Sequence, residues 1–129
     1  MASSVLDNEN VLKLIASNAE SGLCRVAIEM VASYGMPVGE DVFETVVWIG
    51  RFMQVSGCPE KVERIKRHEV KMHLCHNARA KDANIRQALI DKLGPQGTKK
   101  NPGPTYGVKS HAWAALAVAV TAHETRKAA

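Results

Sequence analysis

Apolar residues in the first part of the chain first follow the spacing of a helix and then form a short continuous run. Positions 11, 12, 14 and 15 share one stripe of a helix, which predicts an N-terminal helical segment within residues 1–22. Asp7 stands where an N-cap is expected, and Gly22 stands where such a helix would end. The next apolar run, residues 24–30, is short and predicts a buried strand.

A second helix is predicted over residues 40–55, after a Gly- and Pro-containing loop at 31–39. Apolar residues in this helix recur at helical spacing, and further apolar residues widen the stripe. We therefore expect the helix to be heavily buried. The stripe consists of Val42, Val46, Ile49 and Met53, and the residues beside it are Phe43, Val47 and Trp48.

The second half of the chain predicts one more strand and three helices. Residues 62–67 mix apolar and charged side chains, which predicts a strand near a sheet edge. Helices are predicted over residues 68–75, 80–93 and 109–123. Gly and Pro are frequent between the last two helices, which predicts a flexible loop over residues 94–108.

Strands that alternate with helices predict an α/β fold, in a single domain over residues 1–129. Two predicted strands are too few for an independent sheet. No apolar window is long enough for a membrane span, and the start of the chain lacks the pattern of a signal peptide. Three cysteines without a CxxC pair indicate a reduced, cytoplasmic protein.

Charge is divided unevenly along the chain, whose net charge is +4. Residues 1–60 carry 3 basic and 8 acidic side chains, whereas residues 61–109 carry 12 basic and 4 acidic ones. A basic block of this kind predicts a surface that binds a polyanion, with nucleic acid as the first candidate. The alternative is a lysine-rich surface that contacts only water.

Seven basic residues and one tyrosine are the predicted nucleic-acid contacts. Lys and Arg side chains bind backbone phosphates, and a tyrosine ring in a Gly/Pro loop can stack on a base or simply anchor the loop. The basic residues are Lys66, Arg67, Arg79, Lys81, Lys99, Lys100 and Lys109, and the tyrosine is Tyr34.

Two residues have the position and chemistry of metal ligands. Glu29 lies at the end of an apolar strand, and ligands gather at the carboxyl ends of strands in α/β sheets. A carboxylate there suits Mg²⁺, which prefers oxygen ligands, although a strand-end glutamate can also face water. His111 lies in the first turn of the last helix, where it could bind a metal, act as a base or be merely exposed. The histidines and cysteine of residues 68–76 lack the two spaced ligand pairs of a structural zinc site.

Three stretches occur in a characteristic order: AIEM at residues 27–30, EVKMHLCHNARAKDANIRQAL at 69–89 and HAWAALAVAVTA at 111–122. Together they resemble the RuvC family of Holliday-junction resolvases, which are ribonuclease-H-like nucleases. The resemblance implies a mixed sheet flanked by helices and an endonuclease that uses Mg²⁺, with two ions in the full family site. It also implies a homodimer that hydrolyses phosphodiester bonds in branched double-stranded DNA.

The same resemblance assigns roles to individual residues. Glu29 matches a metal-binding glutamate at a strand end, and His111 matches the first acidic position of the last helix, where some members have histidine. Lys71 matches a catalytic lysine that approaches the scissile phosphate. Ala114 stands where many members have a second aspartate, and no first-strand Asp-x-Gly motif precedes Glu29. The resemblance therefore implies an N-terminally truncated domain with impaired activity. The alternative is a non-catalytic nucleic-acid-binding remnant or a regulatory partner of a resolvase.

Overall fold

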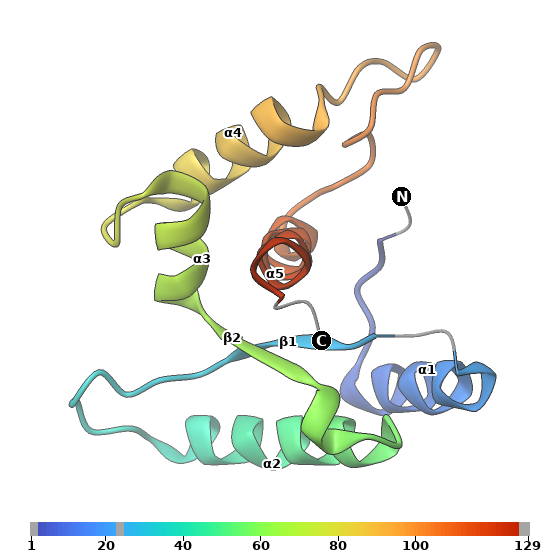
Figure 1. Cartoon of the computed structure of the whole chain (residues 1–129), viewed down its shortest axis with the longest axis vertical. Coiled ribbons are helices and arrows are strands. Elements are labelled where there is room, and N and C mark those ends of the chain that lie inside the picture. The colour runs from blue at the N-terminus through green and yellow to red at the C-terminus, as the bar shows by residue number, and fades with distance from the viewer. Residues whose placement is uncertain (1–2, 23–24, 127–129) are drawn as a thin grey trace. The chain divides into compact units, whose positions relative to one another are not determined.

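The computed structural model describes residues 3–22 and 25–126 (Figure 1). It is a mixed α/β structure, 57% helical, with a small two-stranded parallel sheet. The chain divides into two compact units. We call Leu6–Lys66 the sheet unit, and residues 67–126 with the short segment before Leu6 the helical unit. Each unit is described by itself below.

The sheet unit begins with α1 (Asn8–Ser21), which has the predicted ends. The Asp7 side chain accepts a hydrogen bond of 2.8 Å from the backbone N–H of Asn10, and so pairs an otherwise unsatisfied donor of the first turn. Gly22 ends the helix in the left-handed conformation, with a φ of 69°. Both ends of the first predicted helix are therefore confirmed.

Two strands and one long helix complete the sheet unit. They are β1 (Ala27–Met30), α2 (Glu40–Val55) and β2 (Glu63–Lys66), and a short 3-10 turn, η1 (Pro59–Lys61), precedes β2. The strand predicted from residue 24 thus starts at Ala27 in the described part, and Cys24 lies outside the described residues. The strands are parallel, and α2 supplies the long connection that parallel pairing needs.

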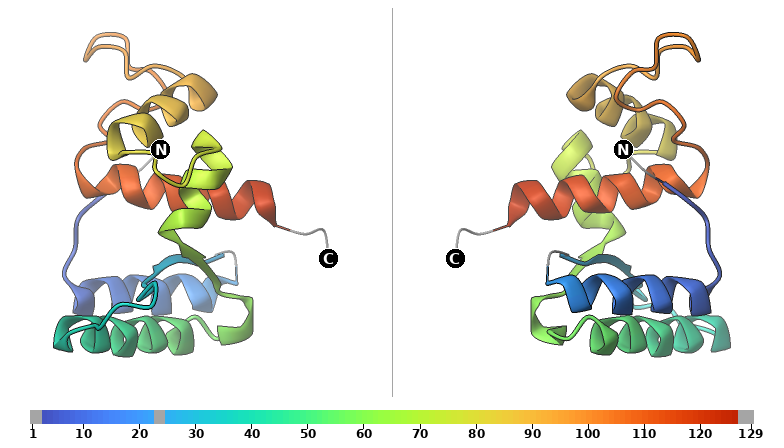
Figure 2. Two further views of the ribbon diagram at one scale, coloured as in Figure 1. Left: turned by 90° about the vertical axis from the view of Figure 1, so that its left-hand side faces the viewer. Right: turned by 90° about the vertical axis from the view of Figure 1, so that its right-hand side faces the viewer.

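Within this unit α1 lies alongside α2 (Figure 2). Arg51 of α2 reaches Glu9 of α1, with 3.8 Å between Nη1 and Oε1. The prediction that α2 is heavily buried is wrong. Of its residues only Ile49 is buried, and Phe43, Val46 and Val47 are 61%, 41% and 56% exposed. The spacing of apolar residues identified the helix correctly, but the described residues provide too few neighbours to cover so wide an apolar surface.

The helical unit packs three helices against one another: α3 (Arg67–Cys75), α4 (Asp82–Leu93) and α5 (His111–Thr125). Its core is apolar, and Leu89 of α4 is fully buried. Small side chains on α5, including Ala117 and Ala122, let that helix pack closely. Several predicted boundaries differ by one or two residues. Arg67 begins α3 instead of ending β2, α4 starts at Asp82 instead of residue 80, and α5 spans His111–Thr125 instead of 109–123.

The predicted Gly/Pro loop between α4 and α5 is irregular, and it is held by its own hydrogen bonds. The buried Thr105 donates from Oγ1 to the carbonyl oxygen of Gly94 at 3.0 Å. Gly103 passes so close to the Pro95 carbonyl oxygen that a Cβ there would lie 1.9 Å from it, so only glycine fits. At the tip, Thr98 and Asn101 exchange two backbone hydrogen bonds of 3.1 Å each. The loop thus presents the two residues between them, Lys99 and Lys100, on a defined turn.

The sequence predicts no membrane-spanning segment, and the helices of the structure can be compared with that prediction. In residues 3–22 and 25–126, no helix has both the length and the apolar character needed to cross a bilayer.

Candidate functional site

Glu29 is the third of the four residues of β1, and its side chain is exposed. In the parallel register it lies opposite Ile65, and Met30 lies opposite Lys66. Because side chains alternate along a strand, Glu29 shares one face of the sheet with Ile65 and Glu63. The predicted position is confirmed: Glu29 is a carboxylate near the carboxyl ends of two parallel strands, where α/β proteins place ligands.

His111 is the first residue of α5 and is exposed. Ser110 before it has a φ of 50° and makes no side-chain cap, so the helix begins abruptly. Ala114, one turn further on, is half-buried and offers no ligand atom. Lys71 lies on α3 and is also half-buried.

Glu29 belongs to the sheet unit, whereas His111 and Lys71 belong to the helical unit. In residues 3–22 and 25–126, no group of three or more His, Cys, Asp or Glu side chains could hold a metal ion. Neither unit alone supplies a complete metal site in its described residues. The convergence of Glu29 and His111 on Mg²⁺ therefore stays a prediction.

Most of the predicted nucleic-acid contacts lie in the helical unit. Arg67 at the start of α3 pairs with Asp82 at the start of α4, so this guanidinium also ties two helices together. Lys81 is the N-cap residue of α4, and Arg79 lies in the turn before it. Lys109 lies just before α5 and is exposed. The arrangement spreads positive charge over the turns that precede α4 and α5.

Two of the predicted contacts lie in the sheet unit. Lys66 is the last residue of β2 and is exposed. Tyr34 lies in the turn after β1 with a φ of 51°, and its side chain is largely exposed. The exposed ring lies in a turn, and its stacking on a base stays a prediction.

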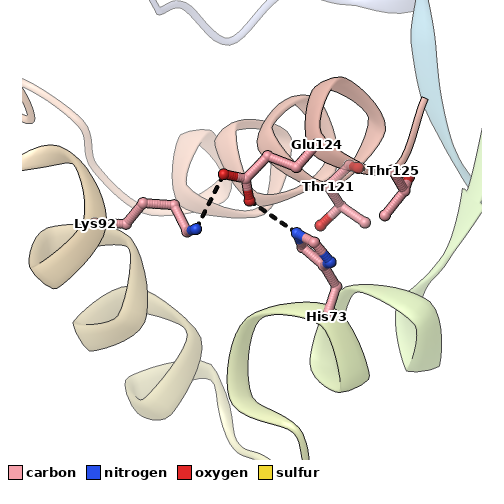
Figure 3. A network of polar contacts seen from close by, with 5 residues as sticks. All are labelled: His73, Lys92, Thr121, Glu124 and Thr125. Atoms are coloured by element: carbon pink, nitrogen blue, oxygen red, sulfur yellow. Dashed lines mark hydrogen bonds and ion pairs between the residues drawn. The ribbon is translucent and has the colours of Figure 1, made fainter. Parts of the chain in front are cut away.

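A polar cluster that the sequence did not indicate joins the three helices of the helical unit (Figure 3). The Glu124 carboxylate of α5 accepts a hydrogen bond at 2.8 Å from His73 Nε2 of α3 and another at 3.0 Å from Lys92 Nζ of α4. The residues of these pairs are 51 and 32 positions apart in the chain, so no local spacing signals the contact. The hydrogen bonds from His73 and Lys92 lower the pKa of Glu124.

We expect the helical unit to lose stability in acid, because the stabilising contribution of this cluster depends on the charge of Glu124. The folded-state pKa of Glu124 lies below its ordinary value of 4.5, so its charge contributes stability above that value. The contribution is lost as the pH falls through the lowered pKa. Glu124→Gln should cost at most about 1 kcal/mol at neutral pH, because the pairs are partly exposed. Urea unfolding of the wild type and of Glu124→Gln, from neutral to acid pH, measures the difference between their free energies of unfolding. This difference should vanish in acid. A difference that stays constant with pH would contradict the assignment.

The structure brings some predicted residues together and leaves others apart. Lys99 and Lys100 share one turn, and Arg67, Arg79 and Lys81 lie around the start of α4. The two predicted metal ligands fall in different units. A scan against protein-family models finds no match, and searches of curated proteins and of solved structures find no significant one.

Proposed function

We propose that this chain is a RuvC-like, Mg²⁺-dependent endonuclease of the cytoplasm that cleaves branched double-stranded DNA as a homodimer. The proposal rests on the three stretches that resemble RuvC resolvases, whose order and position fit the elements of the fold. AIEM forms β1, the central stretch forms most of α3 and all but the end of α4, and HAWAALAVAVTA begins α5. A ribonuclease-H-like arrangement is part of the proposal.

The single observation that carries the proposal is the position of Glu29. A carboxylate near the carboxyl end of β1, next to a second parallel strand, is what this class of nuclease requires. The connection between the strands runs through α2, as in other parallel α/β units. The side chain of Glu29 is exposed, which supports the proposal.

The proposed roles follow from the chemistry of each side chain. Glu29 and His111 would hold Mg²⁺. A bound Mg²⁺ ion would activate a water molecule and neutralise negative charge on the phosphate. Lys71 would steady the scissile phosphate through its ammonium group. Water would attack the phosphorus atom, the P–O bond to the 3′ sugar oxygen would break, and a 5′-phosphate would remain on the other product strand. The described residues before β1 form α1 and no strand, so none of them adds a carboxylate from a neighbouring strand.

A second candidate function is nucleic-acid binding without cleavage, as a remnant or as a regulatory partner of a resolvase. Ala114 favours it, since a methyl group there cannot act as a metal ligand. The charge of the helical unit supports binding in either case, because residues 67–126 carry 10 basic and 4 acidic side chains.

The test is a cleavage assay with the purified full chain, a labelled four-way DNA junction and Mg²⁺. A nuclease of the proposed kind nicks the junction, leaves a linear duplex of the same sequence intact and stops when the metal is chelated. Binding of the junction without any cleavage would select the second candidate. Absence of both binding and cleavage at low salt would contradict both.

We expect the loop tip between α4 and α5 to contact DNA phosphates. Lys99→Ala and Lys100→Ala should each lower the slope of log affinity against log salt concentration by about 1, because each lysine displaces about one counterion from DNA. Junction binding measured by fluorescence anisotropy at several salt concentrations gives the slope. Lys13→Ala on α1 is the matched control, since it removes an exposed lysine from the acidic sheet unit. An equal change in all three variants would contradict a specific contact at the tip.

A further inference from the structure

Tyr106 lies near the end of the loop between α4 and α5, and the residues of its own unit leave its side chain at least 43% exposed. Its neighbours along the chain are covered: Thr105 is fully buried, and Val108 is 2% exposed. These two residues anchor the loop to the core of the helical unit. Tyr106 is therefore not needed as an anchor, and its ring is left for another role.

Hydrogen bonds within the loop fix the backbone on both sides of Tyr106. The Tyr106 N–H donates to the carbonyl oxygen of Gly103 at 3.1 Å. The Val108 N–H donates to the carbonyl oxygen of Thr105 at 3.3 Å. The Thr105 hydroxyl donates to the carbonyl oxygen of Gly94 at 3.0 Å, which ties this turn to the end of α4. A tyrosine on such a backbone loses little conformational freedom on binding, because only its two side-chain torsions are left to order.

The charged side chains of this loop are all positive. Residues 94–110 contain three lysines, Lys99, Lys100 and Lys109, and no Asp or Glu. The loop extends beyond the end of α4 and returns to the start of α5 (Figure 1). An accessible aromatic ring on a basic segment has both parts of a site for single-stranded nucleic acid, a surface for stacking of bases and cations for the backbone.

We propose that the Tyr106 ring stacks on an unpaired base of single-stranded DNA, while the lysines of the loop bind neighbouring phosphates. Bases inside a duplex already stack on one another, whereas an unpaired base offers its face to a side chain. The site therefore favours single strands over duplexes. It does so without reading sequence, because every base has an aromatic face. This inference needs neither Glu29 nor His111 nor Mg²⁺, so it stands or falls separately from the proposed cleavage.

The test is fluorescence anisotropy of the full chain with a labelled oligothymidylate about 15 nucleotides long, at low salt. Tyr106→Ala removes the ring, and Tyr106→Phe keeps it. We expect Tyr106→Ala to raise the dissociation constant at least about fivefold and Tyr106→Phe to stay within about twofold of the wild type. The slope of log affinity against log salt concentration should be the same in all three proteins, because no positive charge is removed.

An abasic strand of the same length separates stacking from phosphate contacts, because it keeps the phosphates and lacks the bases. The wild type and Tyr106→Ala should bind this strand equally, and they should also bind a duplex equally. Phe43→Ala is the matched control, since it removes a ring that is 61% exposed from the acidic sheet unit. It should leave the affinity for the oligothymidylate unchanged.

Thermal unfolding followed by circular dichroism checks that Tyr106→Ala keeps its fold, since the bonds that hold this turn come from the backbone and from Thr105. Wild-type affinity of Tyr106→Ala for the oligothymidylate would overturn the proposal. So would an equal loss of its affinity for the abasic strand, or an equal loss in Phe43→Ala. The wild type alone provides a further check, because binding no tighter to the oligothymidylate than to the abasic strand would also overturn the proposal.

Discussion

Glu29→Gln should lower the rate of Mg²⁺-dependent cleavage of a four-way junction by about a hundredfold or more. The substitution keeps the size of the side chain and its hydrogen-bonding oxygen but removes the negative charge that holds a divalent cation. Even residues that only orient metal ligands contribute about 10–100-fold, so loss of a ligand should cost at least as much. Single-turnover cleavage at saturating protein measures the chemical step separately from DNA binding.

The matched control is Glu63→Gln, because Glu63 lies on the same face of the sheet but near the start of β2. It should keep nearly full activity. Thermal unfolding should be similar in both variants and the wild type, since Glu29 is exposed and substitutions of exposed side chains usually change stability little. Cleavage at the wild-type rate by Glu29→Gln would remove this residue from the proposed site. Equal losses in both variants would point to a general effect of charge.

Leu89→Ala should destabilise the helical unit by about 2–5 kcal/mol. The side chain is fully buried in the middle of α4, which packs against α3 and α5. Its removal gives up apolar burial and leaves a cavity that the surrounding helices fill only in part. Because the net stability of a domain is about 5–15 kcal/mol, such a loss is a large part of the total. Urea unfolding followed by helical circular dichroism measures it.

Met72→Ala is the control for the core variant, because Met72 is an exposed apolar residue on α3 of the same unit. Its unfolding free energy should stay within about 0.5 kcal/mol of the wild type. Similar losses in both variants would show that burial at Leu89 does not determine the stability of this unit. Retained stability in Leu89→Ala would contradict the packing of the three helices around that residue.

Local signals predicted most of the elements. Asp7 and Gly22 marked the ends of α1, and α2 has the predicted bounds of 40 and 55. A cap or a helix-ending glycine acts within one turn, so it can be recognised from neighbouring residues alone. Boundaries next to another element were less certain. Arg67 was predicted to end a strand, but it begins α3, where it pairs with Asp82 fifteen residues later.

The candidate site was predictable residue by residue but not as an arrangement. Glu29 and His111 lie at the strand end and helix start that their neighbours in the sequence indicated. Convergence of the two side chains stays a prediction, because it would need contacts between parts of the chain more than 80 residues apart in sequence, and no periodic pattern encodes such a contact. For the same reason, no pattern in the sequence indicates the pairing of Glu124 with His73 and Lys92.

Which face of a helix is covered also depends on tertiary packing. The apolar residues of α2 predicted heavy burial, yet Val46 and Val47 are exposed. In contrast, Thr105, a small polar residue in the loop between α4 and α5, is completely buried. Apolar spacing records which surfaces gain from burial, because each such side chain is driven out of water. It carries no information on which neighbour is present to cover them. The amino-acid sequence thus determined the helices, the strands and the division of charge between the two halves. Only the folded chain decided the parallel register of β1 and β2, the polar cluster around Glu124 and the apolar surface that α2 leaves open, because each of these depends on partners distant in the sequence.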